Sequence, residues 1–227
     1  MSNNQRKLYL LRKEILFDES PVLVSTKPDE NWQKDWKIMA GDWKYEDGYL
    51  IGIEPGERGG IIFSRECFNK PVMLTCKMST VLPATRDVNC VFCAHWNDEI
   101  DNLGLSYVCG LNGWYEDKCG IERNDGSVCL GTNYKYVPGT EIEMTVGAID
   151  GHCFMFVDGN LVCEFVDDRP DYIRDGHVGI SPWSTILKVR DLEIREIVWQ
   201  PRKQAYEPQF DYKEIMKTFH KENFLKE

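Results

Sequence analysis

The sequence is short of basic residues. It has 227 residues, with 27 Lys and Arg against 37 Asp and Glu, so its formal net charge is −10. Nucleic acids and anionic membrane surfaces are bound through concentrated Lys and Arg. The charge balance therefore argues against a nucleic-acid or membrane partner and favours neutral or cationic ligands.

Long hydrophobic runs are also missing. No segment approaches the roughly 20 apolar residues that cross a bilayer. The N-terminal "MSNNQRKLYLLRKEILF" begins like a signal peptide, but its apolar run, 8–11, is four residues long and is followed at once by charged residues. Because a signal peptide needs a longer apolar region, we expect a cytoplasmic protein.

Motifs of two enzyme classes are absent. The glycine-rich "EPGERGG" lacks the Lys-Ser/Thr ending of a phosphate-binding loop, and the chain contains no Gly-x-Ser-x-Gly nucleophile elbow. No cofactor is expected.

The nine cysteines are an odd number in a chain much larger than small disulfide-rich scaffolds. We expect reduced, mostly buried thiols. Cys90 and Cys93 form a Cys-x-x-Cys pair, but residues three apart on an extended strand point to opposite faces. The pair is therefore predicted to pack in the core and not to bind zinc.

The acidic loop "FVDDRPDYIRDG" allows two interpretations. Asp167, Asp168 and Asp171 could hold Ca²⁺, but Arg169 and Arg174 lie among them and the spacing is not that of an EF-hand. A solvated loop is the preferred interpretation, and no metal site is predicted.

Asp-Gly pairs divide the chain into short segments rich in Val, Ile, Phe and Tyr. They occur in "KYEDGYLIG", "IERNDGSVCL", "GAIDGHCFMF" and "FMFVDGNLVCEF". Asp-Gly is a strong hairpin signal because both positions tolerate positive φ. The spacing predicts an all-β fold, a two-sheet antiparallel jelly-roll sandwich.

The C-terminal part changes pattern after the last predicted strand, "LKVRDLEIREIVW" (187–199). A phase slip at Arg190 and Asp191 in that strand indicates a bulge. After Pro201, "DYKEIMKTFHKENFLKE" has helical apolar spacing. We expect an N-terminal arm joining the sandwich (1–29), the sandwich (30–200), and a linker with an amphipathic helix (201–227). The helix either docks on the sandwich or binds a partner subunit or a second copy.

The segment "VPGTEIEMTVGAIDGHCFMFVDGNLVCEF", followed by "HVGIS" and "LKVRDLEIREI", resembles the closing half of the concanavalin A-like lectin/glucanase and laminin-G superfamily. The opening "KDWKIMAGDWKYEDGYLIG" is similar to the start of such domains in bacterial sugar-processing proteins. Through "KDW" (34–36) and "LSY" (105–107), the chain is nearest to uncharacterised bacterial proteins associated with pectin and rhamnogalacturonan utilisation. This resemblance implies two sheets whose concave face binds carbohydrate.

The stretch "HWNDEIDN" is the first candidate for catalysis. Glu99, Ile100 and Asp101 match the first half of the superfamily's retaining-glucanase strand motif, in which carboxylates alternate onto one face. The second Glu of that motif is absent, and glycoside hydrolysis normally needs two carboxylates. A solvated loop is therefore the alternative interpretation. His95 is a possible general base, or alternatively a histidine hydrogen-bonded to a backbone carbonyl.

Sugar sites combine an aromatic surface with acids, amides or Arg. Several segments that we expect on the central sheet or its rim offer this mixture. The predicted substrate-binding residues are Trp96, Asn97, Tyr107, Trp114, Glu122, Arg123 and Trp183.

These observations predict a protein that binds a saccharide or glycoside. If it is also an enzyme, the expected reaction is hydrolysis or elimination at a glycosidic bond, with His95, Glu99 and Asp101 as the catalytic candidates. Two alternatives stay open. One is a non-catalytic carbohydrate-recognition module, and the other is an interaction subunit acting through the C-terminal helix.

Overall fold

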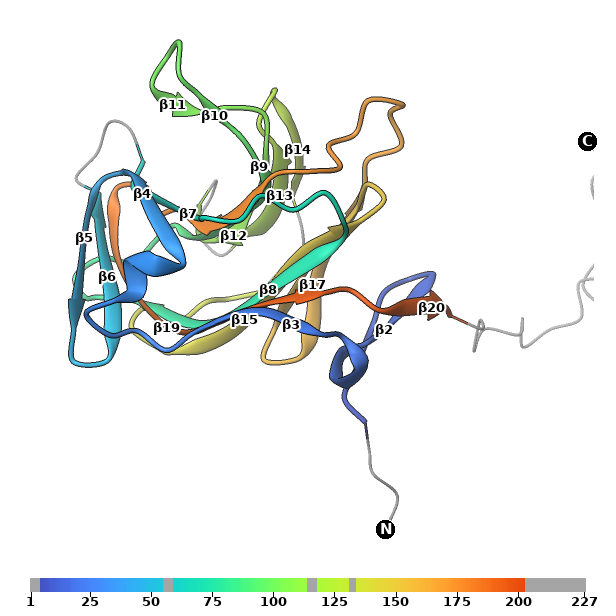
Figure 1. Cartoon of the computed structure of the whole chain (residues 1–227), viewed down its shortest axis with the longest axis horizontal. Helices are drawn as coiled ribbons and strands as arrows, with labels where there is room; N and C mark the ends of the chain where they lie inside the picture. The colour runs from blue at the N-terminus through green and yellow to red at the C-terminus, as the bar shows by residue number, and fades with distance from the viewer. Residues whose placement is uncertain (1–4, 55–58, 114–117, 131–133, 203–227) are drawn as a thin grey trace, which may run out of the picture.

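The computed structural model describes residues 5–54, 59–113, 118–130 and 134–202, with the backbone alone for 127–130. Two antiparallel β-sheets face each other as the upper and lower layers of Figure 1. The all-β, two-sheet sandwich predicted from the sequence is confirmed. No helix in these described ranges is long and apolar enough to cross a membrane.

The upper sheet has seven strands. In spatial order they are β14 (Ser127–Leu130), β13 (Cys119–Arg123), β12 (Tyr107–Leu111), β9 (Val88–Ala94), β18 (His177–Ile180), β7 (Ile61–Ser64) and β4 (Trp36–Ala40). A small hairpin, β10 (Trp96–Asn97) and β11 (Asn102–Leu103), projects above this sheet (Figure 1).

The lower sheet has eight strands. In spatial order they are β17 (Asn160–Val166), β16 (His152–Val157), β15 (Ile142–Ile149), β8 (Val72–Thr80), β19 (Thr185–Glu196), β6 (Tyr49–Glu54) and β5 (Asp42–Glu46), and β3 (Val22–Thr26) pairs with β19. Two short 3-10 helices complete the regular structure, η1 (Phe17–Glu19) and η2 (Trp32–Lys34).

The Asp-Gly turns join neighbouring strands as the sequence predicts. Asp47 and Gly48, between β5 and β6, both have positive φ, at 50° and 82°. The pairs at 150–151 and 158–159 repeat this geometry. The bulge predicted near Asp191 is also confirmed, because Asp191 has φ 51° and the pairing of β19 with β8 shifts there.

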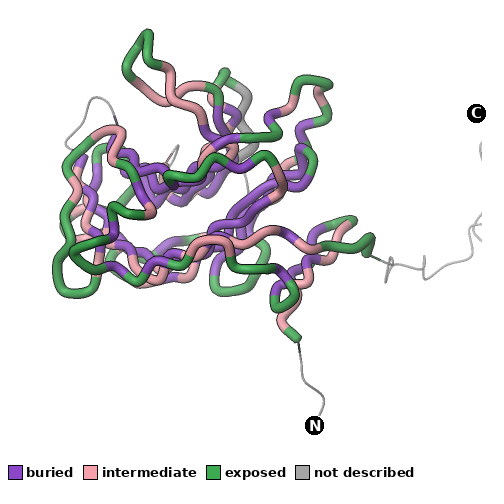
Figure 2. The backbone as a smooth tube through the Cα atoms, in the orientation of Figure 1, coloured by how far each residue is buried: buried purple, intermediate pink, exposed green. Residues whose placement is uncertain are grey.

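The main core lies between the two sheets. Figure 2 shows the buried stretches in the two facing layers and exposed turns around them. Trp36, Phe92 and Tyr107 are among the largest fully buried side chains. Full burial of a large apolar side chain contributes roughly 1.5–3 kcal/mol each, so this core is the main source of stability.

The prediction that Cys90 and Cys93 point to opposite faces is wrong. Both pack on the main core. Cys93 has φ 47°, and the pairing of β9 with β18 shifts between His177 and Gly179, so a bulge interrupts the alternation. All eight cysteines whose side chains are described are free thiols, and six of them are buried, as expected.

The N-terminal arm packs on the outer side of the lower sheet. Strands β1 (Lys7–Tyr9) and β2 (Lys13–Leu16) form a three-stranded sheet with β20 (Trp199–Pro201). Leu8, Ile15 and Phe17 bury themselves against Phe154 and Phe156. The arm therefore closes a second, smaller core. The predicted helix after Pro201 lies outside the described residues.

A buried histidine holds this arm to the lower sheet. Nε2 of His152 lies 2.7 Å from a carboxylate oxygen of Glu164, and Nδ1 lies 3.2 Å from Nζ of Lys13 on β2. Burial lowers the pKa of His152 below its ordinary value of 6.5; the carboxylate of Glu164 opposes this shift, and the charge of Lys13 adds to it. The folded protein therefore prefers neutral His152.

This arrangement predicts that the free energy of unfolding falls as the pH drops below about 6.5, because the unfolded chain then takes up a proton that folded His152 resists. Denaturant titrations at pH 7.5 and 5.5 measure the difference. His152→Gln should reduce it, because this variant lacks the proton-binding group that the folded protein keeps neutral. Equal pH dependence in wild type and His152→Gln would contradict this account.

Candidate functional site

The outer face of the upper sheet carries a separate apolar cluster. Side chains alternate along a strand, so Val91 points away from the main core while Cys90 and Phe92 enter it. Val91 packs with Phe63 and with Trp96 of the projecting hairpin, whose ring meets Phe63 edge-on at 6.4 Å. The hairpin therefore covers part of this face and leaves Trp96 half-buried on it.

A polar site adjoins this cluster on the same face. Side chains two residues apart on a strand share a face, so Asn89 of β9 and Asp87, the residue before β9, point the same way as Val91. Asn89 pairs in register with Gly110 of β12. A Cβ atom on Gly110 would lie 1.8 Å from Oδ1 of Asn89, and one on Gly113 would lie 3.0 Å from Oδ1 of Asp87. The two glycines therefore make the room that these polar side chains occupy. We call Asp87, Asn89, Gly110 and Gly113 the Asp87–Asn89 site.

The hydrogen bonding of this site is incomplete. Nδ2 of Asn89 donates to Asp87 at 3.2 Å, and Nε of Arg86 donates to the other carboxylate oxygen at 2.7 Å. Among the residues that the structure describes, Oδ1 of Asn89 has no partner, although Asn89 is only 6% exposed, and Oδ1 of Asn112 is buried without a partner as well. A buried acceptor left unpaired costs about 1–3 kcal/mol, so these oxygens suit a ligand that donates hydrogen bonds.

Burial also affects the acid of this site. It raises the pKa of Asp87 above its ordinary value, while the hydrogen bonds from Arg86 and Asn89 oppose the rise. The carboxylate is therefore held by two donors in a poorly solvated position.

The surface beside Asn89 is made largely of backbone. Gly110 stands opposite Gly120 of β13 in the register, so two neighbouring strands place no side chain there. One row along the strands, Val108 stands opposite Glu122, and both are half-buried. Glu122 is thus a predicted residue that the structure places on this outer face.

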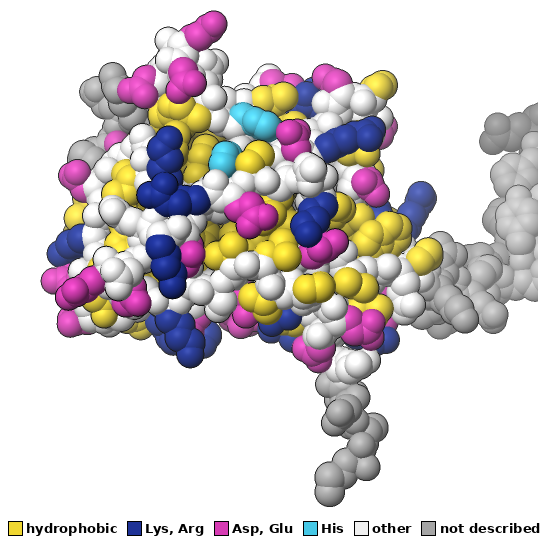
Figure 3. Space-filling view, viewed as in Figure 1, with side chains coloured by type: hydrophobic (Ala, Val, Ile, Leu, Met, Phe, Trp, Pro, Cys, Tyr) yellow, Lys and Arg dark blue, Asp and Glu magenta, His cyan; other side chains and the backbone are white. Residues whose placement is uncertain are grey.

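His95 does not lie on the strand face that the sequence suggests. The bulge at Cys93 breaks the alternation, and Nε2 of His95 lies 3.0 Å from the carbonyl oxygen of Asp175. This is the alternative interpretation, a histidine bonded to a backbone carbonyl. Histidine side chains reach the surface in the upper half of Figure 3.

Glu99 and Asp101 lie in the turn of the projecting hairpin and are exposed. Asp101 has φ 48°, and Oδ1 of Asn97 accepts a hydrogen bond from the backbone N–H of Glu99 at 3.0 Å. The hypothesis of a strand that lines up two carboxylates is therefore wrong, because Asn97 starts a turn there. Figure 3 shows acidic side chains at the tip of this projection.

Tyr107 and Arg123 face the main core, although the sequence predicted them in a ligand site on the concave face or rim of the central sheet. They are register partners on the face that carries Phe92, and they are 0% and 3% exposed. Both bind the carboxylate of buried Asp167, at 2.8 Å from the Tyr107 hydroxyl and 2.9 Å from the Arg123 guanidinium. Arg169 adds a further bond to Asp167 at 3.0 Å.

This buried ion cluster links the two sheets, because Arg123 ends β13 and Asp167 follows β17. It also accounts for the acidic loop, because Asp167 and Asp171 of the loop, together with Asp125, pair with Arg123 and Arg169. Among the described residues no group of three or more His, Cys, Asp or Glu could hold a metal ion. The loop is therefore tied to the sandwich by ion pairs and not simply solvated.

Two further aromatic residues, Trp183 and Trp114, were predicted to bind substrate. Trp183 is 42% exposed, and its ring lies against Gly59, where a Cβ would come within 2.8 Å of it. Trp114 lies outside the described residues.

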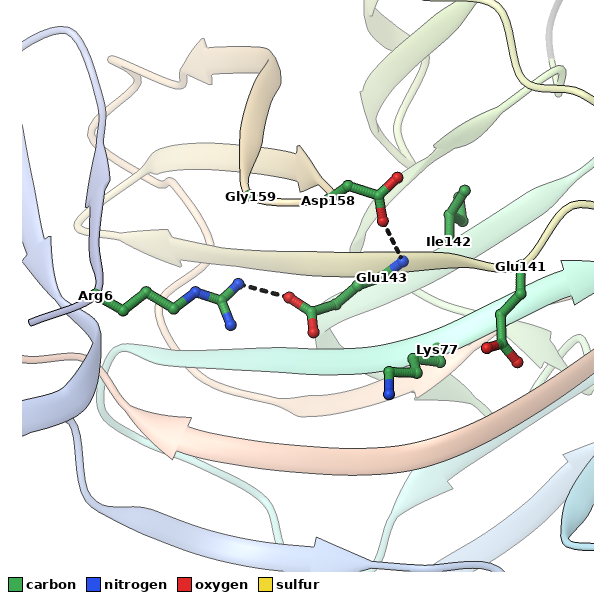
Figure 4. A pocket seen from close by; sticks show the side chains of 7 residues that line it. All are labelled: Arg6, Lys77, Glu141, Ile142, Glu143, Asp158 and Gly159. Atoms are coloured by element: carbon green, nitrogen blue, oxygen red, sulfur yellow. Dashed lines mark hydrogen bonds and ion pairs between the residues drawn. The ribbon is translucent and has the colours of Figure 1, made fainter. Parts of the chain in front are cut away.

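The lower sheet has a hollow of its own on the outer side, shown in Figure 4. It has a volume of about 450 Å³ and lies between the arm and the end of β15. Its charged side chains are paired: Arg6 with Glu143 at 2.5 Å, and Lys77 with Asp191 at 3.2 Å. Because these charged side chains pair with one another, they are less suited to bind a ligand than the polar groups of the Asp87–Asn89 site.

Sequence reasoning missed Asp87 and Asn89, although a signal was present. In "RDVNCVF" the polar residues Asp87 and Asn89 continue the outward phase of Val91. Their contact with Gly110 depends on the pairing of β9 with β12, which the sequence alone does not reveal.

No family model matches the chain, and no curated protein matches it. Solved structures with this fold include a Bacillus subtilis protein of unknown function with a galectin-like fold (TM-score 0.61, 15% identity, 78% of this chain and 96% of that one). The carbohydrate binding module CBM66 from Bacillus subtilis is also similar (TM-score 0.58, 12% identity, 71% and 95%). A third is the Emp46p carbohydrate recognition domain (TM-score 0.51, 11% identity, 79% and 96%). The chain therefore has a lectin-like fold of the galectin and concanavalin A type.

Proposed function

We propose that the protein binds a saccharide on the outer face of the upper sheet, at the Asp87–Asn89 site. The observation that carries this proposal is the buried Oδ1 of Asn89 against Gly110, which has no hydrogen-bond partner in the described part of the chain. A sugar hydroxyl can donate to that oxygen, and a second hydroxyl can donate to Asn112. The carboxylate of Asp87 provides a further acceptor beside them.

The surroundings suit the rest of a sugar ring. Half-buried Trp96 offers an aromatic surface, and Val108 offers an apolar one next to the glycine backbone. Sugars present C–H patches flanked by hydroxyls, so an apolar surface beside fixed acceptors matches their two kinds of surface. Glu122 lies in the same row as Val108 and is placed to reach an extended ligand.

The fold supports a binding role. The similar structures include a carbohydrate binding module and a carbohydrate recognition domain, which are named for binding and not for cleavage. Glycoside cleavage normally requires two carboxylates at the scissile bond, and Glu99 and Asp101 lie in an exposed turn. We therefore place recognition first, and we propose pectin-derived oligosaccharides as the first ligands to test, because the sequence motifs resemble pectin-utilisation proteins.

A panel of neutral and pectin-derived oligosaccharides, titrated by calorimetry, tests this proposal. Asn89→Ala should weaken binding at least tenfold, about 1.4 kcal/mol, because it removes the acceptor that the ligand satisfies. Asn160→Ala is the matched control at an exposed asparagine on β17 and should bind normally. Equal affinity of Asn89→Ala and wild type for every bound saccharide would contradict the proposed site.

The same samples distinguish recognition from cleavage. Chromatography of each oligosaccharide after long incubation should show no product with wild type. Product formation that disappears in Glu99→Gln would overturn the proposal in favour of an enzyme.

A further inference from the structure

A cavity of about 200 Å³ lies at one end of the sandwich, and the proposed saccharide site does not use it. Its walls come from four segments, 68–72, 92–93, 148–151 and 172–176. We call it the end cavity. Since an apolar cavity of roughly 150 Å³ can hold benzene, the end cavity has room for a molecule with a single ring.

One wall of the end cavity is a strained piece of backbone. Among the described residues nine other than glycine have positive φ, and eight of them are Asp, Asn or Ser. Cys93 is the exception, at φ 47° in the next-to-last position of β9. Gly176 packs so closely on this bulge that a Cβ there would lie 2.4 Å from the Cys93 carbonyl carbon. Such strain costs about 1–3 kcal/mol and is concentrated at ligand sites and active sites.

The lining has an apolar base. Val72, Phe92, Ala148 and Ile173 are all buried residues of the cavity wall. Burial raises the pKa of the Cys93 thiol to about 12, so at neutral pH it is an uncharged, polarisable contact. An apolar ring bound in the cavity would therefore displace water from an apolar surface.

Cationic side chains stand at the rim. The guanidinium of Arg174 lies 4.4 Å above the ring of Tyr172, and within the described ranges it pairs with no carboxylate. Lys70 also lines the cavity, with its Nζ 2.7 Å from Glu196. Asp150 is the one acid among the lining residues, and it interacts electrostatically with Lys13 of the arm. Asp175, next to Arg174, does not line the cavity and is exposed to solvent. Arg174 is therefore the charge that remains for a ligand.

From this combination we infer that the end cavity is a second binding site, for a small aromatic or branched aliphatic carboxylate. The apolar part enters between Phe92 and Ala148, and the carboxylate pairs with Arg174 at the rim. Arg174 is exposed, but its stacking on Tyr172 holds the guanidinium in place, which lowers the entropy lost on binding.

Titration of the full chain with benzoate and with benzyl alcohol, followed by calorimetry or protein NMR, tests this inference. Benzoate should bind in the millimolar range or better, and benzyl alcohol, which lacks the charge, at least tenfold more weakly. Arg174→Gln should remove most of this difference. Arg202→Gln is the matched control, because Arg202 is also exposed and lies 5.2 Å from a tyrosine ring, that of Tyr9, away from the cavity.

A second variant tests the cavity itself. Ala148→Leu fills it and should abolish binding of both compounds. No benzoate binding at millimolar concentration, or equal benzoate affinity in Arg174→Gln and wild type, would overturn the inference. Benzoate should not compete with a saccharide, so failure of this site leaves the Asp87–Asn89 site untouched. Should Ala148→Leu fail to fold, Arg174→Gln still decides.

Discussion

Replacing Asp167 with Asn is expected to lower the free energy of unfolding by about 3 kcal/mol, because it removes the one buried carboxylate that pairs with the buried Arg123 guanidinium. The other two carboxylates near this guanidinium, those of Asp125 and Asp171, are partly exposed to solvent. Asp167 and Arg123 are each 3% exposed, so water cannot replace the lost interaction. The same carboxylate accepts hydrogen bonds from Tyr107 and Arg169. In the variant, the amide group of Asn has a donor nitrogen where one carboxylate oxygen was, and this nitrogen cannot accept a hydrogen bond.

Denaturant unfolding of the variant beside Asp168→Asn measures this effect. Asp168 is the adjacent, exposed acid, so its variant should differ from wild type by less than about 0.5 kcal/mol. A loss at Asp167→Asn no larger than at Asp168→Asn would show that the cluster does not hold the sheets together.

The contribution of Asp167 to the free energy of unfolding also depends on pH. Burial alone would raise the pKa of Asp167, but hydrogen bonds from Arg169, Arg123 and Tyr107 outweigh it and hold the pKa well below its ordinary value of 3.8. The contribution is therefore complete above that ordinary value and is lost as the pH falls toward the lower folded pKa. The difference in the free energy of unfolding between wild type and Asp167→Asn should shrink only in strong acid.

Gly110→Ala is expected to cost about 1–3 kcal/mol of stability and to abolish saccharide binding, because the new methyl group has no space. It would lie 1.8 Å from Oδ1 of Asn89 and 2.8 Å from the backbone carbonyl of Val88. The asparagine must move, and the acceptor of the proposed site moves with it.

A double-mutant cycle separates the two effects. In the Asn89→Ala background, Gly110→Ala should cost clearly less stability, because the closest clash is gone. The remaining contact with the Val88 carbonyl sets the residual cost. Additive costs in the double variant would mean that Asn89 does not lie over Gly110.

The elements that the sequence predicts correctly are those coded by neighbouring residues. The Asp-Gly turns need only two residues in a left-handed conformation, and the bulge near Asp191 shows as a slip between apolar and charged positions. The bulge at Cys93 cannot be read from the sequence in this way. The stretch "CVFCA" is apolar throughout, so a bulge there does not disturb any alternation of apolar and polar residues.

The site depends on contacts between distant residues, which limited its prediction. Arg123 was expected to bind substrate because nothing near it in the chain reveals its buried partner, Asp167, forty-four residues later. Asn89 becomes a candidate only when the register places it over Gly110. Trp96 and Glu122 were predicted from residue type, and the structure places both on the outer face, Glu122 one row from Gly120.

The place where a bound saccharide contacts the protein tests the Asp87–Asn89 site most directly. Backbone amide shifts during titration with the tightest oligosaccharide of the panel report this location. We predict the largest shifts in 87–91, 107–113 and 119–122, on the outer face of the upper sheet. Largest shifts around Arg6, Lys77 and Glu143, in the hollow on the lower sheet, would contradict the account.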